Sequence, residues 1–159
     1  MTKNKLEKCF SKSLKADDSL WGMKLHNNPL AHQNTPADYI ISRTIYDNYI
    51  SLILILVECK QVTCKDGKGR LAFKRLKQMH DLLNFTSISP LHESNFCIAY
   101  YDKRWDNSDV YIVPVKIMHE LVNSWDYVSL NREDASVQLK DYKVDVLKGG
   151  VIDLKCLKK

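Results

Sequence analysis

The most regular pattern along the chain is an apolar run in its first half. Residues 51–57 read Ser-Leu-Ile-Leu-Ile-Leu-Val, so both faces of an extended segment there would be apolar. A short run of this kind predicts a central strand that is covered on both faces. Nearer the N-terminus, Leu6, Phe10 and Leu14 recur every four residues. This spacing predicts an amphipathic helix over residues 4–14.

Shorter patterns predict the elements around this strand. Four segments have the apolar residues and flanking turns that are typical of strands: residues 20–26, 38–41, 95–101 and 109–113. Helical spacing of apolar residues predicts two further helices, one over residues 70–84 and one whose first turn contains Pro114. Helices and strands that alternate in this way predict an α/β domain with a small mixed central sheet flanked by helices.

Length and composition favour a single compact domain. A chain of 159 residues, 45% of them hydrophobic, fits one core. We expect residues 1–159 to form that domain, with its core at about residues 3–124 and a C-terminal extension, 125–159, packing on the core. No apolar stretch is long enough to cross a membrane, and no signal peptide is visible. The five cysteines show no metal-type pairing, so we expect free thiols in a reducing cytoplasm.

The net charge of +5 is concentrated in one segment. Between Lys60 and Lys77 seven basic residues stand against one acidic residue, which gives this segment +6 and leaves −1 for the remainder. The basic residues that follow Lys60 are Lys65, Lys68, Arg70, Lys74, Arg75 and Lys77. A patch of this kind suits a polyanion such as the phosphate backbone of DNA. The alternative interpretation is a solvated helix face that binds nothing.

Two charged residues, Glu58 and Lys60, follow the apolar strand. Residues two apart on a strand leave the same face, so the carboxylate and the ammonium should lie together at the end of the strand. The same Asp/Glu-x-Lys pattern occurs at 66–68, 141–143 and 153–155, but none of these follows a long apolar strand. Glu58 and Lys60 are therefore the candidate catalytic pair, with a structural ion pair as the alternative.

Asp38 supplies a second carboxylate. It follows Pro36, begins the preceding predicted strand, and stands twenty residues before Glu58. If the two strands are antiparallel neighbours, the carboxylates approach each other and favour a cation between them. Oxygen ligands suit Mg²⁺ or Mn²⁺, which can stabilise phosphate charge and acidify a bound water while Lys60 orients that water. The alternative is a turn aspartate with no role in chemistry.

These residues resemble the motif of a known nuclease superfamily. Thr35-Pro36-Ala37-Asp38 followed by Val57-Glu58-Cys59-Lys60 is similar to the motif of the PD-(D/E)xK nucleases, and the chain most resembles the Holliday-junction resolvases of the RecU and archaeal types. The resemblance extends from the N-terminal helix to about Ser124. It implies a restriction-endonuclease-like core and a homodimer that cleaves branched DNA with Mg²⁺, or with Mn²⁺ in its place, and leaves a 5′-phosphate. It also implies the cytoplasm of a bacterial, archaeal or phage-infected cell.

The resemblance assigns the central roles of the motif. Asp38, Glu58 and the backbone carbonyl of Cys59 would ligate the metal, and Lys60 would lie near the attacking water. The basic residues that follow Lys60 would then hold the DNA backbone without reading its sequence.

Two further site residues come from the same resemblance. An acidic residue on the first helix of these nucleases is commonly a further metal ligand, which matches Glu7, and a glutamine on the helix after the catalytic strand commonly faces the site, which matches Gln78. A glutamate on the helix surface beside Lys8 is the alternative interpretation of Glu7.

Two other functions stay open on the sequence. The same chemistry could serve a homing, restriction-like, repair or phage nicking endonuclease. A chain of a different class, a non-catalytic DNA-binding module, could keep the fold and the basic segment alone. The retained Asp38, Glu58 and Lys60 favour the enzyme.

Overall fold

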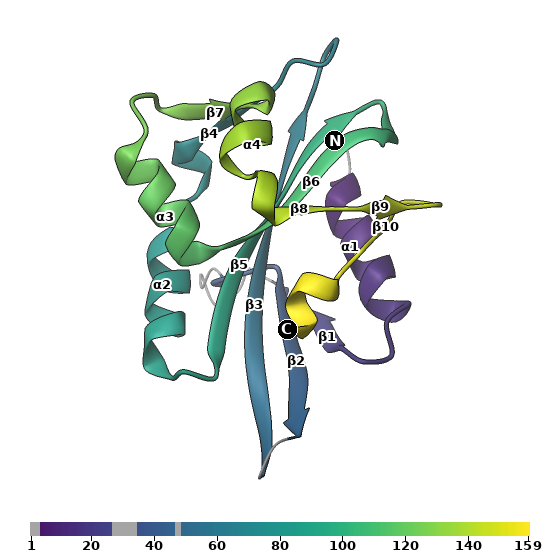
Figure 1. Ribbon diagram of the computed structural model, residues 1–159, viewed down its shortest axis with the longest axis vertical. Helices are drawn as coiled ribbons and strands as arrows, with labels where there is room; N and C mark the ends of the chain where they lie inside the picture. Colours follow the sequence, from purple (N-terminus) through teal and green to yellow (C-terminus); the bar gives the residue numbers. More distant parts are fainter. Residues whose placement is uncertain (1–3, 27–34, 47–48) are drawn as a thin grey trace.

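The computed structural model describes residues 4–26, 35–46 and 49–159, and a six-stranded sheet lies at its centre (Figure 1). In spatial order its strands are β1 (Trp21–Lys24), β2 (Tyr39–Tyr46), β3 (Ile50–Thr63), β5 (His92–Asp102), β6 (Arg104–Pro114) and β8 (Lys143–Val144). Neighbouring strands are antiparallel except β3 and β5, which are parallel. The predicted α/β class with a small mixed central sheet flanked by helices is therefore confirmed.

The remaining elements cover this sheet or join it at its ends. The helices of the described chain are α1 (Lys5–Lys15), α2 (Met79–Ile88), α3 (Val115–Ser124) and α4 (Arg132–Gln138). Two short ladders pair β4 (Arg70–Ala72) with β7 (Ser129–Asn131), and β9 (Val146–Leu147) with β10 (Val151–Ile152). Helix α1 and the C-terminal segment lie over one face of the sheet, and α2 and α3 lie over the other (Figure 1).

The predicted first helix is confirmed, and its apolar stripe explains its position. Leu6, Phe10 and Leu14 are buried against the sheet. Asn4 caps the helix, because its side-chain oxygen accepts the backbone N–H of Glu7 at 3.5 Å. The cap also places Glu7 in the first turn, close to the sheet.

The central strand is longer than its apolar run. Strand β3 continues to Thr63, because β5 pairs with it in parallel from Leu54 to the end. Isoleucines 53 and 55 and Val57 pack on the α1 face, whereas Leu56 and Val62 pack on the α2 face. Glu58 and Lys60 therefore lie inside the strand, and the prediction that they stand at its end is wrong.

The predicted helix over residues 70–84 is confirmed only from Met79 onward, and its first half is wrong. Residues 70–72 form β4, which pairs antiparallel with β7 and buries Leu71. A single turn of 3₁₀ helix, η1 (Phe73–Arg75), follows, and α2 begins only at Met79. Helical spacing among nearby residues carries no signal of a pairing with a strand some sixty residues further along, so the local pattern overstated the helix.

The C-terminal residues contact the sheet at several points. Strand β8 adds to β6 at the edge of the sheet, and Ile152, Leu154 and Leu157 are buried in the core on the α1 face. The backbone N–H of Ile152 donates to Ser13 Oγ at 2.7 Å, which ties this segment to α1.

Candidate active site

The candidate site lies where one neighbour of β3 stops and the other continues. Strand β2 begins at Tyr39, directly opposite Val57, so the β2 ladder ends there. Strand β5 remains paired with β3 as far as Thr63. From Glu58 onward, β3 therefore has a strand partner on one side only, and its backbone groups on the β2 side need another partner.

The backbone and side chain of Asp38 fill this gap. The Asp38 N–H donates to the carbonyl of Val57 at 3.1 Å, and Asp38 Oδ2 accepts the N–H of Cys59 at 2.7 Å. The carboxylate thus accepts a backbone N–H of β3 at the position where the β2 ladder has ended, and it lies beside Glu58 on the neighbouring strand. The structure brings Asp38 and Glu58 together, as the antiparallel arrangement required.

Glu58 and Lys60 share the α2 face of β3 and contact each other. The Glu58 residue is only 4% exposed, and Lys60 Nζ donates to Glu58 Oε1. Lys60 Nζ also donates to Gln78 Oε1 at 3.2 Å, from the residue that precedes α2. The structure therefore places Gln78 at the site through its contact with Lys60.

Burial and neighbouring carboxylates raise the pKa of both carboxyl groups. Burial raises the pKa of Glu58 to about 7, with a further rise from the adjacent Asp38 carboxylate, although the hydrogen bond from Lys60 opposes the shift. Burial also raises the pKa of Asp38, as does the charge of Glu7, against the lowering effect of the Cys59 N–H. A pair of poorly exposed acids with raised pKa values is typical of a functional site that takes up a positive charge.

Glu7 lies near this pair without touching it. Its carboxylate forms an ion pair with Lys24 and accepts a hydrogen bond from Asn4 Nδ2 at 2.7 Å. Its effect on Asp38 is electrostatic only. The structure thus brings Glu7 to the edge of the site but leaves its carboxylate engaged elsewhere.

Lys24 is a charged neighbour that the sequence patterns did not single out. It lies on β1 opposite Tyr39, one residue from Asp38. Its pKa is raised chiefly by the hydrogen bond to Glu7 and further by the charge of Asp38. An antiparallel pairing of the segments 20–26 and 38–41 would have placed Lys24 beside Asp38, but no pattern in the sequence specified that pairing.

Cys59 contributes through its backbone. Its N–H points toward Asp38, and the N–H and C=O of one strand residue point to the same side, so its carbonyl also faces the side that β2 leaves open. The thiol packs on the opposite face in the core with α1, where burial raises its pKa well above the usual value.

The predicted DNA-binding residues are exposed and follow the site along the chain. Lys65, Lys68, Arg70, Lys74, Arg75 and Lys77 all have exposed side chains. Lys65 and Lys68 exchange two backbone hydrogen bonds of 2.9 Å across a tight turn whose central residues, Asp66 and Gly67, have φ values of 50° and 76°. Glycine favours this left-handed conformation, so the turn between β3 and β4 projects both lysines.

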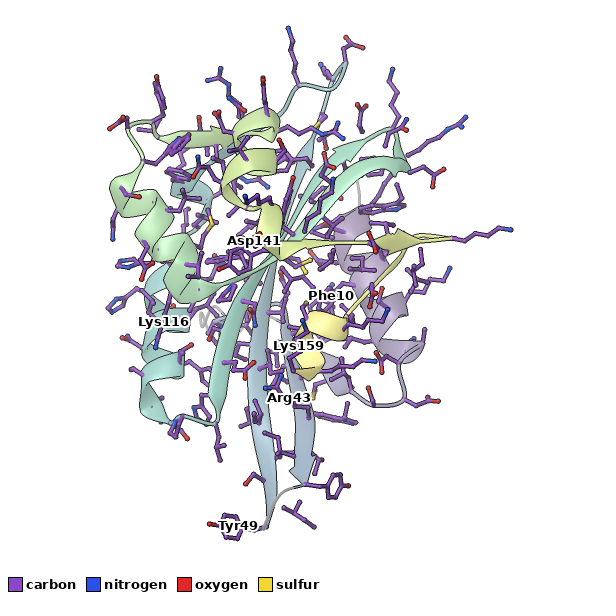
Figure 2. All side chains as sticks on the ribbon, viewed as in Figure 1. Phe10, Arg43, Tyr49, Lys116, Asp141 and Lys159 are labelled. Atoms are coloured by element: carbon purple, nitrogen blue, oxygen red, sulfur yellow. The ribbon has the colours of Figure 1, made fainter. Side chains whose placement is uncertain are left out.

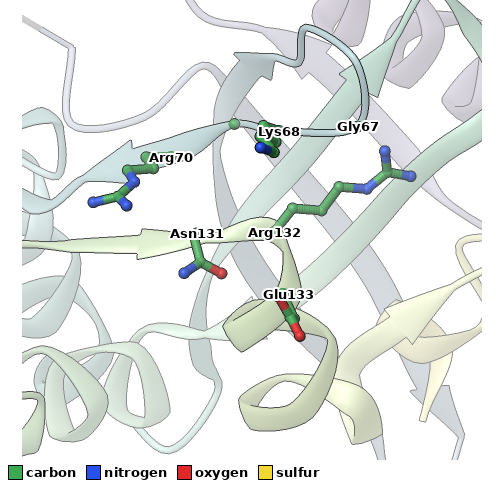
Figure 3. A pocket seen from close by; sticks show the side chains of 7 residues that line it. Gly67, Lys68, Arg70, Asn131, Arg132 and Glu133 are labelled. Atoms are coloured by element: carbon green, nitrogen blue, oxygen red, sulfur yellow. The ribbon is translucent and has the colours of Figure 1, made fainter.

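A pocket of about 510 Å³ lies beside this turn (Figure 3). It is lined by Gly67, Lys68, Gly69, Arg70, Asn131, Arg132 and Glu133. Arg132 is engaged by Asp109 at 2.6 Å and by Asp102 at 3.4 Å. Lys68, Arg70 and Glu133 form no ion pair with the part of the chain that the structure describes, so the two cations outnumber the one free carboxylate of this pocket.

Comparisons with known proteins give a structural likeness at low sequence identity. No protein-family profile and no curated protein matches this chain. A solved structure, that of the Holliday junction resolvase Hjc from the archaeal hyperthermophile Archaeoglobus fulgidus, is similar to it at 12% sequence identity. The likeness covers 85% of this chain and 90% of the resolvase chain, with a TM-score of 0.45. At this level it assigns neither an activity nor a metal to this chain.

Two absences among the described residues bear on the predicted site and partners. Within residues 4–26, 35–46 and 49–159, no three His, Cys, Asp or Glu side chains are grouped closely enough to hold a metal ion. No helix in the same ranges has the length and apolarity needed to cross a membrane.

Proposed function

We propose that this chain is a metal-dependent nuclease that hydrolyses phosphodiester bonds in DNA, with Asp38, Glu58 and Lys60 as its catalytic residues. One observation supports this function above the others: the buried carboxyl group of Glu58 and the half-buried one of Asp38 lie together, with an ammonium group against one of them. A structural ion pair needs only one carboxylate. A second, half-buried carboxylate beside it costs free energy unless a further cation binds there.

The groups that are present fit a hard divalent cation. Asp38, Glu58 and the Cys59 carbonyl offer oxygen ligands beside β3, and Mg²⁺ prefers oxygen and keeps several of its waters. Two carboxylates and a carbonyl, completed by water, suffice for such an ion, although the described residues contain no cluster of three acidic or histidine side chains. Bound there, Mg²⁺ or Mn²⁺ would supply charge stabilisation to a phosphate and acidify a water.

Lys60 and Gln78 would position the nucleophile. Lys60 Nζ is held between Glu58 and Gln78, which fixes its direction on a rigid strand. In the proposed reaction the ammonium would orient the attacking water, and Gln78 would hold the ammonium in place. Glu7 would join the metal shell only after its carboxylate separates from Lys24.

The basic segment would hold the DNA. Its six exposed cations begin at the turn between β3 and β4 and continue along the chain to Lys77, which precedes Gln78. They therefore occupy the stretch of chain that leads from this turn to the candidate site. Contacts of this type bind phosphates and position a duplex without reading its bases.

Branched DNA is the substrate that we propose first, cleaved by a homodimer with one site for each strand. The motif at Asp38, Glu58 and Lys60 supports this substrate through its resemblance to junction resolvases. A homing, restriction-like, repair or phage nicking endonuclease would use the same residues on another DNA.

A non-catalytic DNA-binding module is the second candidate, and one observation favours it. Two acidic residues of the site already have lysine partners, Glu58 with Lys60 and Glu7 with Lys24. Such pairs could neutralise the site without any metal. The two candidates differ in whether DNA is cleaved after it binds.

Cleavage assays on defined substrates separate these candidates. Plasmid, linear duplex and four-way junction would be incubated with the protein and Mg²⁺, Mn²⁺ or EDTA. Metal-dependent cleavage that favours the junction supports the first proposal, and cleavage of all three substrates supports another nuclease of the same chemistry. DNA binding without cleavage under every condition would contradict catalysis and leave the binding module. Asp141→Asn, in an exposed Asp-x-Lys pattern, is the matched control for Asp38→Asn.

A further inference from the structure

A small pocket lies on the β6 side of β5, whereas the candidate active site lies on the β2 side of β3. Strand β6 pairs with β5 as far as Pro114, which faces Asn95, and the chain then enters α3. Because β5 already begins at His92, its first residues have no partner in β6. The pocket, of about 190 Å³, lies between these residues, the last turns of α2 and the start of α3. Pockets for drug-sized ligands begin at roughly 300 Å³, so this one suits a small ion or group.

The start of α3 provides hydrogen-bond donors to the pocket. The residues that line it there are Pro114, Val115 and Lys116. No side chain caps this end of the helix, because proline stands at the cap position. The first N–H groups of a helix have no partner within the helix, and they form the positive end of its dipole. An oxyanion is a partner that satisfies such groups.

The side chain of Asn95 is a second, independent sign of a ligand in this pocket. Asn95 lines the pocket and is only 8% exposed. Its side-chain amide forms no hydrogen bond with the part of the chain that the structure describes. Buried amides are nearly always hydrogen-bonded, because one without a partner costs free energy. A ligand that accepts hydrogen bonds would satisfy the N–H groups of Asn95 and those of α3 together.

The charges around the pocket favour an anion. Lys116 has an exposed side chain and forms no ion pair with any described residue. Glu93 also lines the pocket, but the Arg43 guanidinium donates to its carboxylate at 2.7 Å and compensates its charge. In the view of Figure 2, Lys116 and Arg43 lie on opposite sides of β5. The charge that remains uncompensated at the pocket is therefore positive.

Two hydroxyl groups hold the wall of the pocket in place. Thr86 Oγ1 donates to Ser94 Oγ at 2.8 Å, and both oxygens lie within 3.0 Å of the Leu82 carbonyl. These contacts join α2 to the beginning of β5. The hydroxyls are thus engaged with the protein, and the donors that stay available to a ligand are those of Asn95, Lys116 and the α3 backbone.

We propose that this pocket binds a small oxyanion of the phosphate type. The N–H groups at the start of α3, the Asn95 amide and the Lys116 ammonium would donate to its oxygens. A cation is disfavoured, because the carboxylate of Glu93 already has Arg43 as its partner. The pocket shares no lining residue with the basic segment and is too small for a duplex, so the inference does not depend on the proposed nuclease activity.

Nuclear magnetic resonance of the wild type, in EDTA and without DNA, tests this inference without any variant. Inorganic phosphate would replace chloride at constant ionic strength. The backbone amides of Lys116 and Ile117 and the side-chain amide of Asn95 should shift with one common dissociation constant, whereas the amide of the distant, exposed Val128 should not. A mononucleotide titrated alongside identifies the source of the anion. Equal affinity supports a site for the phosphate group of a larger molecule, and weaker affinity supports a site for the free ion.

Asn95→Leu removes the amide and keeps the size of the side chain. Because the amide has no partner in the described chain, the variant should unfold at the same denaturant concentration as the wild type in chloride. Phosphate should stabilise the wild type, since a ligand of the folded state opposes unfolding. Its affinity should fall at least about tenfold in Asn95→Leu, which lacks a hydrogen bond to a charged ligand. Asn123→Leu, exposed near the other end of α3, is the matched control and should keep the full response.

Phosphate could also bind to the basic segment, so the alanine variant of Lys65, Lys68, Arg70 and Lys74 completes the test. This variant keeps the pocket and should keep the response to phosphate. Wild-type amides of α3 that do not shift with phosphate, or a response that Asn95→Leu retains in full, would overturn the inference. A response that is lost with the basic segment and kept in Asn95→Leu would also overturn it and assign the phosphate to that segment.

Discussion

Apolar side chains are usually buried and charged side chains usually exposed, and the two halves of β3 break this rule in opposite ways. In the first half, Ile50 and Leu52 are apolar and exposed. In the second half, which we call the charged end although the strand continues to Thr63, Glu58 is charged and buried and Lys60 is charged and half-buried. A fully paired strand in the centre of a sheet normally shows neither feature. The segment between them, residues 54–57, follows the ordinary rule and carries apolar side chains on both faces.

The offset between the neighbours of β3 explains this difference. Strand β2 covers residues 50–57 of β3, and β5 covers residues 54–63, so only 54–57 have both partners. Each end of β3 is left with one open edge. The Asp38 carboxylate fills the edge at the charged end, whereas no described residue fills the edge at the apolar end. Places where a protein departs from local rules are where function is expected, and the charged end of β3 is the candidate site.

The largest expected effect comes from removing either carboxylate at the charged end. Asp38→Asn and Glu58→Gln should each reduce cleavage roughly a thousandfold, or about 4 kcal/mol, because each removes a proposed metal ligand. DNA binding should survive, since the basic segment is unchanged. Steady-state cleavage and binding assays on one substrate measure both. If Asp38→Asn or Glu58→Gln cleaved DNA as fast as the Asp141→Asn control, the carboxylates of the charged end would have a structural role only.

A smaller effect is expected from the basic segment that continues the charged end. Replacing Lys65, Lys68, Arg70 and Lys74 with alanine should lower the slope of log K against log salt by about 0.9 for each phosphate that the protein no longer binds. Affinity should fall similarly for duplex and junction, because these side chains read no bases. The matched control replaces four exposed lysines elsewhere: Lys15, Lys116, Lys148 and Lys159.

The salt dependence of the two variants decides the role of the segment. A slope equal to that of the wild type in the first variant would mark the segment as a solvated surface. Loss of junction binding alone would instead assign it the recognition of branched DNA. Far-UV circular dichroism should be unchanged in both variants, since all eight side chains are exposed.

The smallest expected effect concerns the metal-free protein, whose free energy of unfolding should depend on pH. Glu58 has a pKa of about 7 when folded and 4.5 as its ordinary value, so the folded state binds its proton more tightly. The stability that the folded state gains from binding this proton is fully present below the ordinary pKa of Glu58. It is lost as the pH rises through the pKa of Glu58 in the folded protein. The free energy of unfolding should therefore fall by about 1 kcal/mol per pH unit between about pH 5 and pH 7.

Denaturant unfolding across this pH range, in EDTA, measures the effect. Glu58→Gln should flatten the dependence, whereas Glu120→Gln, at an exposed position on α3, should retain it. A dependence that Glu58→Gln leaves intact would mean that Glu58 is already ionised in the metal-free protein.

Local and repeated patterns predicted the parts of the fold that the structure confirms. The four-residue spacing of Leu6, Phe10 and Leu14 located α1, because that spacing reflects burial of one helix face. The apolar run at 51–57 located the centre of β3. The approach of Asp38 and Glu58 was expected if their strands were antiparallel neighbours, which β2 and β3 are, while the roles of the two residues stay predictions.

Features that depend on distant partners could not be predicted in this way. Strand β3 extends to Thr63 only because β5 pairs with it, and β4 forms only because β7 lies beside it. The position of Lys24 depends on the β1–β2 register, and that register has no sequence signature. The exposure of Ile50 and Leu52 was missed for a related reason: an apolar run predicts burial, and β5 pairs with β3 only from Leu54 onward.

Calorimetric titration with Mg²⁺ or Mn²⁺ tests the central claim, a metal site at the charged end of β3, most directly. The wild type should bind the metal and Asp38→Asn should not, because Asp38 is a proposed ligand. Lys60→Ala should still bind it while losing cleavage, because the proposed role of Lys60 is to orient the water. Metal binding that is lost in Lys60→Ala and kept in Asp38→Asn, or that is absent from the wild type, would contradict the account.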